Sequence, residues 1–263
     1  MISIPRLRVF AGPNGSGKTT IIQAVKNTTA NEKPLNMGTY INADDIVILL
    51  SNNNFNFTSY NEKGDAVALA DFAKESGLLN TTFTLENFQS AISLKDNNLF
   101  LEKADFIDRV AQILARYLRE RMLAKKITFS FETVFSHDSN VEIMRRAAEA
   151  GYKVYLYFVS TTSPKINKYR AELRVKEGGH PVPEDKIESR YYRSLDLMFE
   201  AAQTCYQSYF FDNSVDNQPF RIVAHFKKEG DKKQWDPIEK DQLPGWFIDY
   251  YLGKVKGNRD NHS

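Results

Sequence analysis

The sequence has a single cysteine, Cys205, among its 263 residues. One thiol cannot form a disulfide within the chain, so a disulfide-stapled scaffold is excluded and a reducing compartment is favoured. No apolar run reaches the ~18 residues that a membrane span needs. The first residues, MISIPRLRVFAG, lack a long apolar segment followed by a small-residue cleavage site. These absences predict a cytoplasmic protein with no membrane partner.

An excess of charge of either sign is also missing. The chain has 35 Lys and Arg against 33 Asp and Glu, a formal net charge of +2. Tight binding to nucleic acid depends on a broad basic surface, so nucleic acid is not expected as a partner. What the chain has in quantity is core-forming material, with 42% hydrophobic residues that include 18 Phe and 13 Tyr. That composition suits a sizeable globular core.

Residues 12–20 read GPNGSGKTT, and residues 12–19 fit the pattern G-x-x-x-x-G-K-[ST] at every fixed position. An apolar strand is predicted just before it at 7–11 and a helix at 18–25, which is the context that the motif requires. Glycines allow successive backbone N–H groups to face phosphate oxygens, and the helix N-terminus adds a favourable dipole. The residues predicted to bind ATP are Gly12, Pro13, Asn14, Gly15, Ser16, Gly17, Lys18, Thr19 and Thr20. Lys18 is expected to reach the β- and γ-phosphates and the Thr19 hydroxyl to ligate Mg²⁺.

Strand-like and helix-like segments alternate along the chain. Strands are predicted at 7–11, 39–43, 127–131, 153–160, 208–212 and 220–225, and helices at 18–25, 104–125, 140–150, 164–176 and 184–206. The nearly continuous apolar run at 153–160 is typical of a central parallel strand. The predicted fold is an α/β P-loop NTPase or kinase domain, a three-layer sandwich with a mainly parallel sheet.

The domain organisation is predicted as one P-loop kinase domain over residues 1–263. Residues 51–103, rich in asparagine and punctuated by glycine, are predicted as a helical insertion after the second strand that packs on the core. The tail at 230–263 is expected to pack one short helix around Trp246 and then to fray.

Asp44 is a candidate catalytic base. It follows the strand predicted at 39–43, and ligands of open α/β sheets bind at the carboxyl ends of the strands. The alternative role for Asp44 is an N-cap of the next helix, which Asp45 could fill instead. Motor-type P-loop ATPases pair the phosphate loop with a strand that ends in Asp. Here the comparable strand ends in Glu132, which favours a kinase.

Three arginines are candidates for stabilising a transferring phosphoryl group. Arg174 lies near the end of one predicted helix, just before Gly178-Gly179, and Arg190 and Arg193 share a face of the next. Cationic side chains on both sides of a glycine hinge are predicted to form a mobile lid that closes on ATP.

The stretches AGPNGSGKTT, YINADDI, FSFETVFSH, RVKEGGHPVPEDKIESRYYRSL and YFFDNS occur in this order between about Leu7 and Ser214. Together they resemble the zeta toxin family of P-loop kinases. The resemblance implies transfer of the ATP γ-phosphate to a sugar hydroxyl of a UDP-activated sugar, typically UDP-N-acetylglucosamine. It also implies a small, separately encoded antitoxin that blocks the ATP site.

The resemblance also assigns roles to single residues. Asp44 aligns with the catalytic base, Lys18 with the phosphate-loop lysine and Arg174 with the first phosphate-binding arginine. Glu132 falls on the acidic residue of the substrate side, with Thr133 next to it.

The chain departs from the family at three positions. Val134 replaces a threonine two residues after the acid, with Thr133 adjacent instead, and Arg116 lies near the position of a further family glutamate. His180 stands at the position of the second lid arginine. Arg190 or Arg193 would then take that role.

Two other functions remain open from the sequence. One is a kinase for a different small hydroxyl compound, such as a metabolite or an antibiotic. The other is an ATP-gated regulatory module that hydrolyses ATP slowly. A kinase for nucleic-acid 5′ ends is the least favoured, because the charge is balanced.

Overall fold

The computed structural model describes residues 4–30, 33–177 and 182–260. The predicted hinge at Gly178-Gly179 and His180 lie outside the described residues. The chain divides into two compact units, of which the first comprises Met1–Met37 with Ser130–Ser263 and the second Gly38–Phe129. Within the described ranges, no helix has the length and apolar character to cross a membrane.

A seven-stranded sheet has the order β11-β10-β9-β8-β1-β7-β4. Its strands are β1 (Arg6–Ala11), β4 (Thr39–Ile41), β7 (Phe129–Thr133), β8 (Lys153–Ser160), β9 (Gln207–Asp212), β10 (Arg221–Glu229) and β11 (Lys232–Trp235). β8 pairs in parallel with both β1 and β9, whereas β10 pairs antiparallel with β9 and with β11. The mainly parallel sheet is therefore confirmed, with an antiparallel C-terminal edge.

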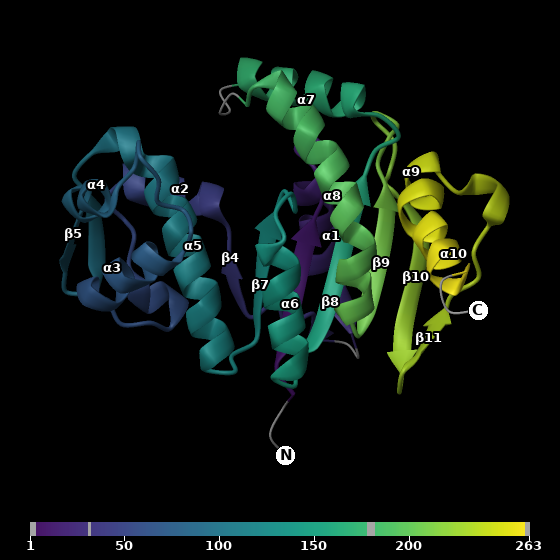
Figure 1. The fold of residues 1–263 in the computed structure, drawn as a ribbon, viewed down its shortest axis with the longest axis horizontal. Helices are drawn as coiled ribbons and strands as arrows, with labels where there is room; N and C mark the ends of the chain where they lie inside the picture. Colours follow the sequence, from purple (N-terminus) through teal and green to yellow (C-terminus); the bar gives the residue numbers. More distant parts are fainter. Residues whose placement is uncertain (1–3, 31–32, 178–181, 261–263) are drawn as a thin grey trace. The chain divides into compact units, whose positions relative to one another are not determined.

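Helices cover both faces of the first unit's sheet. Its main helices are α1 (Lys18–Lys26), α6 (Ser139–Glu149), α7 (Pro164–Lys176) and α8 (Glu184–Thr204). In Figure 1, α6 and α8 lie in front of the central strands and α1 lies behind them. The predicted three-layer α/β arrangement is confirmed.

The C-terminal tail is more ordered than predicted. After β11 it forms α9 (Gly245–Phe247), the π-helical segment η4 (Ile248–Leu252) and α10 (Gly253–Asp260). Trp246, Phe247 and Tyr251 are all buried. The predicted helix around Trp246 is therefore present, but the helical run is longer than the short helix expected and reaches Asp260. The buried aromatic side chains fix it to the first unit.

The second unit contains helices and a β-hairpin. Its elements beyond β4 are α2 (Ala43–Ser51), η1 (Phe57–Tyr60), α3 (Ala66–Glu75), α4 (Leu85–Ser90), β5 (Ile92–Lys95), β6 (Asn98–Leu101), η2 (Ala104–Phe106) and α5 (Ile107–Ala124). The insertion predicted at 51–103 lies inside this unit and includes the β5–β6 hairpin as well as helices. The second unit extends beyond the predicted insertion at both ends, because α2 packs against α5 and both helices belong to it.

Most strands begin or end at other residues than predicted: β1 and β9 begin one residue earlier, and β10 covers Arg221–Glu229 instead of 220–225. The differences at β4 and β7 concern candidate site residues. β4 ends at Ile41 rather than at residue 43, because Asn42 already caps α2. A two-residue pairing of β2 (Thr29–Ala30) with β3 (Lys33–Pro34) also precedes it, so β4 is not the second strand in chain order. β7 covers Phe129–Thr133 instead of 127–131, which places Glu132 inside the strand.

Candidate nucleotide-binding site

The phosphate loop connects β1 to α1, as predicted. Gly15 has a φ of 74° and Gly17 a φ of 92°, a region that L side chains rarely adopt. A Cβ atom at Gly15 would also lie 2.5 Å from Asn167 O, and one at Gly17 would lie 2.1 Å from Asn213 Nδ2. Backbone conformation and close neighbours both require glycine at these two positions.

Lys18 is buried at the start of α1, with 8% of its surface exposed. Its Nζ donates a hydrogen bond to Pro13 O at 3.1 Å and lies 3.8 Å from Glu132 Oε1. The ammonium therefore lies over the loop, between a carbonyl of the loop and a carboxylate of β7. Such a position suits a cation that meets the oxygens of a bound phosphate.

Thr19 and Thr20, next to Lys18 in the first turn of α1, are exposed. No cluster of three or more His, Cys, Asp or Glu that could hold a metal occurs among the described residues. The residues present offer a magnesium ion the Thr19 hydroxyl and the Glu132 carboxylate as oxygen donors, and a bound nucleotide would add its phosphate oxygens. Oxygen donors of this kind fit a hard cation that keeps several waters.

The structure shows how Thr133 is held. Its Oγ1 donates to Asn140 Oδ1 at 3.2 Å and accepts from Phe135 N at 3.1 Å. Phe135 has a φ of 60°, so the Thr133 hydroxyl helps to stabilise an unusual turn after β7. The predicted contacts of Glu132 and Thr133 with substrate stay predictions.

The predicted lid arginines lie on α7 and α8. Arg174 and Arg193 are exposed, and Arg190 is half-buried. Lys168 of α7 is 2.7 Å from Glu188 and 3.9 Å from Glu184, both on α8, so ion pairs join the two helices. Figure 1 shows α7 beyond the ends of β8 and β9. The roles of the three arginines in phosphoryl transfer stay predictions.

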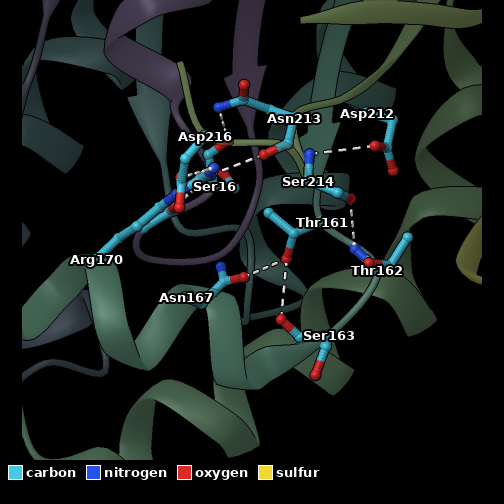
Figure 2. A network of polar contacts seen from close by, with 11 residues as sticks. Ser16, Thr161, Thr162, Ser163, Asn167, Arg170, Asp212, Asn213, Ser214 and Asp216 are labelled. Carbon is cyan, nitrogen blue, oxygen red and sulfur yellow. Dashed lines mark hydrogen bonds and ion pairs between the residues drawn. The ribbon is translucent and has the colours of Figure 1, made fainter. Parts of the chain in front are cut away.

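Sequence reasoning missed the residues that hold the phosphate loop from outside (Figure 2). Asn167 Nδ2 donates to Asn14 O, and Asn213 Nδ2 donates to Ser16 O at 3.0 Å. Arg170 Nη1 donates to Gly15 O at 3.4 Å and to Asn213 O at 2.7 Å. These partners are more than 40 residues apart in the chain. Two of them had a signal in the sequence: Arg170 lies four residues before Arg174, and Asn213 belongs to the stretch YFFDNS.

Further contacts fasten this network to the fold. Thr161 Oγ1 hydrogen-bonds to Asn167 Oδ1, and the Tyr191 hydroxyl on α8 donates to Thr161 O at 2.6 Å. Burial raises the pKa of Tyr191, so this phenol stays protonated and remains a donor. The phosphate loop, α7 and α8 are thus joined in one unit.

Asp44 belongs to the second unit, in the first turn of α2. The Asn42 side chain accepts a hydrogen bond from Asp44 N at 2.9 Å and is the N-cap. The alternative assignment of the cap to Asp44 or Asp45 is therefore wrong. Asp44 is exposed. Burial, followed by the charge of Asp45, the neighbour of Asp44, raises the pKa of Tyr60 to about 12. The role of Asp44 as a base stays a prediction.

Two comparisons with known proteins give partial likenesses. An uncharacterised protein of Haemophilus influenzae is 35% identical over 69 residues, which cover 26% of this chain and 49% of that protein. The match therefore spans about half the length of this relative.

Two solved structures are similar to the chain at lower sequence identity. A complex of AvrRxo1-ORF1 and ORF2 with ATP has 12% identity and a TM-score of 0.49, covering 92% of this chain and 62% of that chain. The PezAT toxin-antitoxin system of Streptococcus pneumoniae has 11% identity and a TM-score of 0.47, covering 81% of this chain and 69% of that chain.

A family model described as an AAA domain matches residues 5–234. The match includes the phosphate loop, β7 with Glu132, and the α7–α8 pair. It covers most of the chain, and it agrees with the nucleotide-binding geometry of β1, the phosphate loop and α1. The chain belongs to the AAA domain family of P-loop nucleotide-binding proteins.

Proposed function

We propose that the protein is an ATP- and Mg²⁺-dependent phosphotransferase that transfers the γ-phosphoryl group to a hydroxyl of a small molecule. The observation that carries this proposal is the attachment of α7 to the phosphate loop through Asn167 and Arg170. It keeps a helix pair with several arginines in the same compact unit as Lys18. Arginines supplied by the same chain are what a kinase needs to neutralise a transferring phosphoryl group.

The residues of the first unit have distinct roles in this proposal. Loop amides and the N-terminus of α1 bind the phosphates. Lys18 exchanges its bond to Pro13 O for oxygens of the β- and γ-phosphates. Magnesium, held by Thr19 and the phosphates, would offset the negative charge of the phosphates. Arg174, with Arg190 or Arg193, stabilises the charge that spreads over the transferring group.

Asp44 is proposed to accept the proton of the acceptor hydroxyl as the γ-phosphoryl group is transferred. The acceptor class is proposed from the zeta toxin resemblance alone: a sugar hydroxyl of a UDP-activated sugar such as UDP-N-acetylglucosamine, with Glu132 and Thr133 on the substrate side. A small antitoxin that covers the ATP site is the corresponding proposed partner.

The test is a transfer assay with purified protein, γ-labelled ATP, Mg²⁺ and a panel of acceptors. The panel holds UDP-sugars, free sugars, nucleosides and hydroxyl-bearing antibiotics. We expect label to move to one acceptor class, and Lys18→Met and Asp44→Asn to abolish that transfer. Label on a free sugar or an antibiotic alone would overturn the UDP-sugar assignment and keep the kinase. Label on no acceptor would overturn the kinase itself.

Membership in the AAA domain family supports a second candidate, an ATP-gated regulatory ATPase. This function requires no acceptor base. It predicts steady ATP hydrolysis without an acceptor and an unchanged hydrolysis rate in Asp44→Asn. A kinase instead predicts hydrolysis that is slow compared with transfer.

A further inference from the structure

Three consecutive carbonyl groups of the phosphate loop accept hydrogen bonds from side chains outside the loop. Figure 2 shows the donors Asn167, Arg170 and Asn213 together with Ser16. The carbonyls belong to Asn14, Gly15 and Ser16, and the donors are Asn167, Arg170 and Asn213, respectively. Two donors come from α7 and the third from the turn after β9. The loop is therefore held through its carbonyl oxygens by two segments that are distant in sequence.

Arg170 is the centre of this support. Besides its bonds to Gly15 O and Asn213 O, its Nε and Nη2 donate to Asp216 Oδ1 at 2.9 and 2.6 Å. Its side chain is 17% exposed, whereas that of Asp216 is 57% exposed. One sheltered guanidinium thus joins three segments: α7, the phosphate loop and the turn at residues 213–216.

We propose that Arg170 is a positioning residue for the nucleotide phosphates, held in place by Asp216. It acts on the loop from outside and leaves transition-state stabilisation to the lid arginines. Its function is to keep the loop in its phosphate-binding shape before nucleotide arrives. A loop ordered in advance loses less conformational entropy when it binds, so affinity rises.

The geometry of the peptide groups gives this support a second effect. Each supported carbonyl shares its peptide group with the N–H of the next residue, so the three N–H groups belong to Gly15, Ser16 and Gly17. A hydrogen bond accepted by a carbonyl polarises its own peptide group and strengthens the N–H as a donor. The positive charge of Arg170 adds to this polarisation in the peptide group of Gly15 O, whose N–H belongs to Ser16 and already donates to Pro13 O at 3.3 Å. The N–H groups of Gly15 and Gly17 are made better donors to anions by the bonds from Asn167 and Asn213.

The test measures nucleotide affinity in a double-mutant cycle. Arg170→Ala, Arg170→Lys, Asp216→Asn and the double variant Arg170→Ala/Asp216→Asn are titrated with ATP and with adenosine, which has no phosphate. Arg145→Ala is the matched control, because Arg145 lies on α6 and pairs with Glu142 of the same helix. Thermal unfolding without nucleotide is recorded for every variant.

Loss of a charge-assisted hydrogen-bond network of this kind weakens binding by about tenfold or more. We expect Arg170→Ala to lose about that much ATP affinity while its adenosine affinity stays near that of the wild type. Asp216→Asn should lose about two- to fivefold, because the pair is partly exposed to solvent. That loss should vanish in the Arg170→Ala background, because Asp216 acts through Arg170. Arg170→Lys should be intermediate and Arg145→Ala unchanged.

Three results would overturn the proposal. Wild-type ATP affinity in Arg170→Ala would show that the support does not matter for binding. Equal losses for ATP and adenosine, with a lower unfolding temperature, would show a structural role only. An additive effect of Asp216→Asn would show that it does not act through Arg170. If Arg170→Ala fails to fold, Arg170→Lys, Asp216→Asn and their combination form the cycle.

The inference rests on the proposed function only in that the protein binds ATP. If the wild type binds ATP but labels no acceptor, the phosphotransferase proposal fails and the affinity cycle still tests Arg170.

Discussion

At some positions of the phosphate loop, neighbouring atoms exclude a side chain as strongly as the backbone angles do. Gly15 faces the backbone of Asn167, whose O and Cα would lie 2.5 and 3.0 Å from an added Cβ. Gly151, at the end of α6, has a φ of 88° but no atom within 4 Å of such a Cβ. Comparing substitutions at these two glycines therefore separates the effect of backbone strain from the effect of steric contact.

We expect Gly15→Ala to lower ATP affinity by about tenfold or more, since the loop must move away from Asn167, a backbone neighbour that cannot rotate aside. Gly151→Ala should lower the free energy of unfolding by about 1–2 kcal/mol through left-handed backbone strain alone. Its ATP affinity should stay unchanged. Calorimetric titration and chemical denaturation of both variants measure the difference, and equal ATP affinities would contradict this account.

Glu132 Oε1 lies 3.8 Å from Lys18 Nζ of the phosphate loop. We expect Glu132→Gln to retain ATP binding, because Lys18 and the loop amides are intact. Turnover should fall by about a hundredfold, because the acceptor loses a contact that positions its hydroxyl. Lys18→Met should lose binding itself. ATP titration and single-turnover rates separate the two effects. Normal turnover in Glu132→Gln would exclude Glu132 from the reaction.

Among the helices and strands, those whose signals are local match the sequence prediction best. β8 and α7 begin and end at the predicted residues. β7 starts two residues later than predicted because α5 ends in a turn: Lys126 has a φ of 53°, and Ile127 N donates back to Met122 O. A left-handed lysine at a helix end carries no clear sequence signal.

The phosphate loop was predictable because its residues are contiguous and their spacing follows from phosphate binding. The support from Arg170 was not, since its partners Gly15 and Asp216 are 155 and 46 residues away in the chain. The Asn42 cap was missed for another reason. Asn42, Asp44 and Asp45 are all good cap residues, and only the backbone decides which one precedes the first helical turn.

The helical tail is anchored by one buried hydrogen bond. Trp246 Nε1 donates to Asp212 Oδ2 at 2.8 Å, and both side chains are more than nine-tenths buried. We expect Trp246→Phe to lower the free energy of unfolding by about 2–4 kcal/mol, because it removes a charge-assisted bond and buried volume. Trp235→Phe, at a position 36% exposed, is the control and should cost about 1 kcal/mol or less. Denaturant titration compares them, and equal losses would show that the bond contributes nothing.

For the molecule as a whole, Lys233 makes stability depend on pH. Burial, followed by the charge of Lys228, lowers the pKa of Lys233 to about 8. Its Nζ donates to Gln203 Oε1 at 2.7 Å and to the Tyr251 hydroxyl at 3.0 Å. An unfolded lysine titrates near ~10.4, so between pH 8 and 10 the unfolded chain binds more protons than the folded one. Lys233 therefore makes the folded state more stable as pH rises through this window.

We expect the stability of the wild type relative to Lys233→Met to increase by about 1 kcal/mol from pH 7.5 to pH 9.5, a figure reduced for partial solvent exposure. Comparing the two proteins cancels the titration of other groups, such as Cys205, whose pKa burial raises to about 11. Thermal and urea unfolding at several pH values measure the difference. A difference that does not change with pH would refute the shifted lysine.

The two ends of the second unit meet. Thr39 N donates to Thr128 O at 3.1 Å, and an added Cβ at Gly38 would lie 2.0 Å from the same oxygen. A segment whose ends lie side by side can be exchanged for another without altering the course of the surrounding chain. In evolutionary terms, a segment of this kind can gain or lose residues between its two ends without a new course for the chain that carries the phosphate loop.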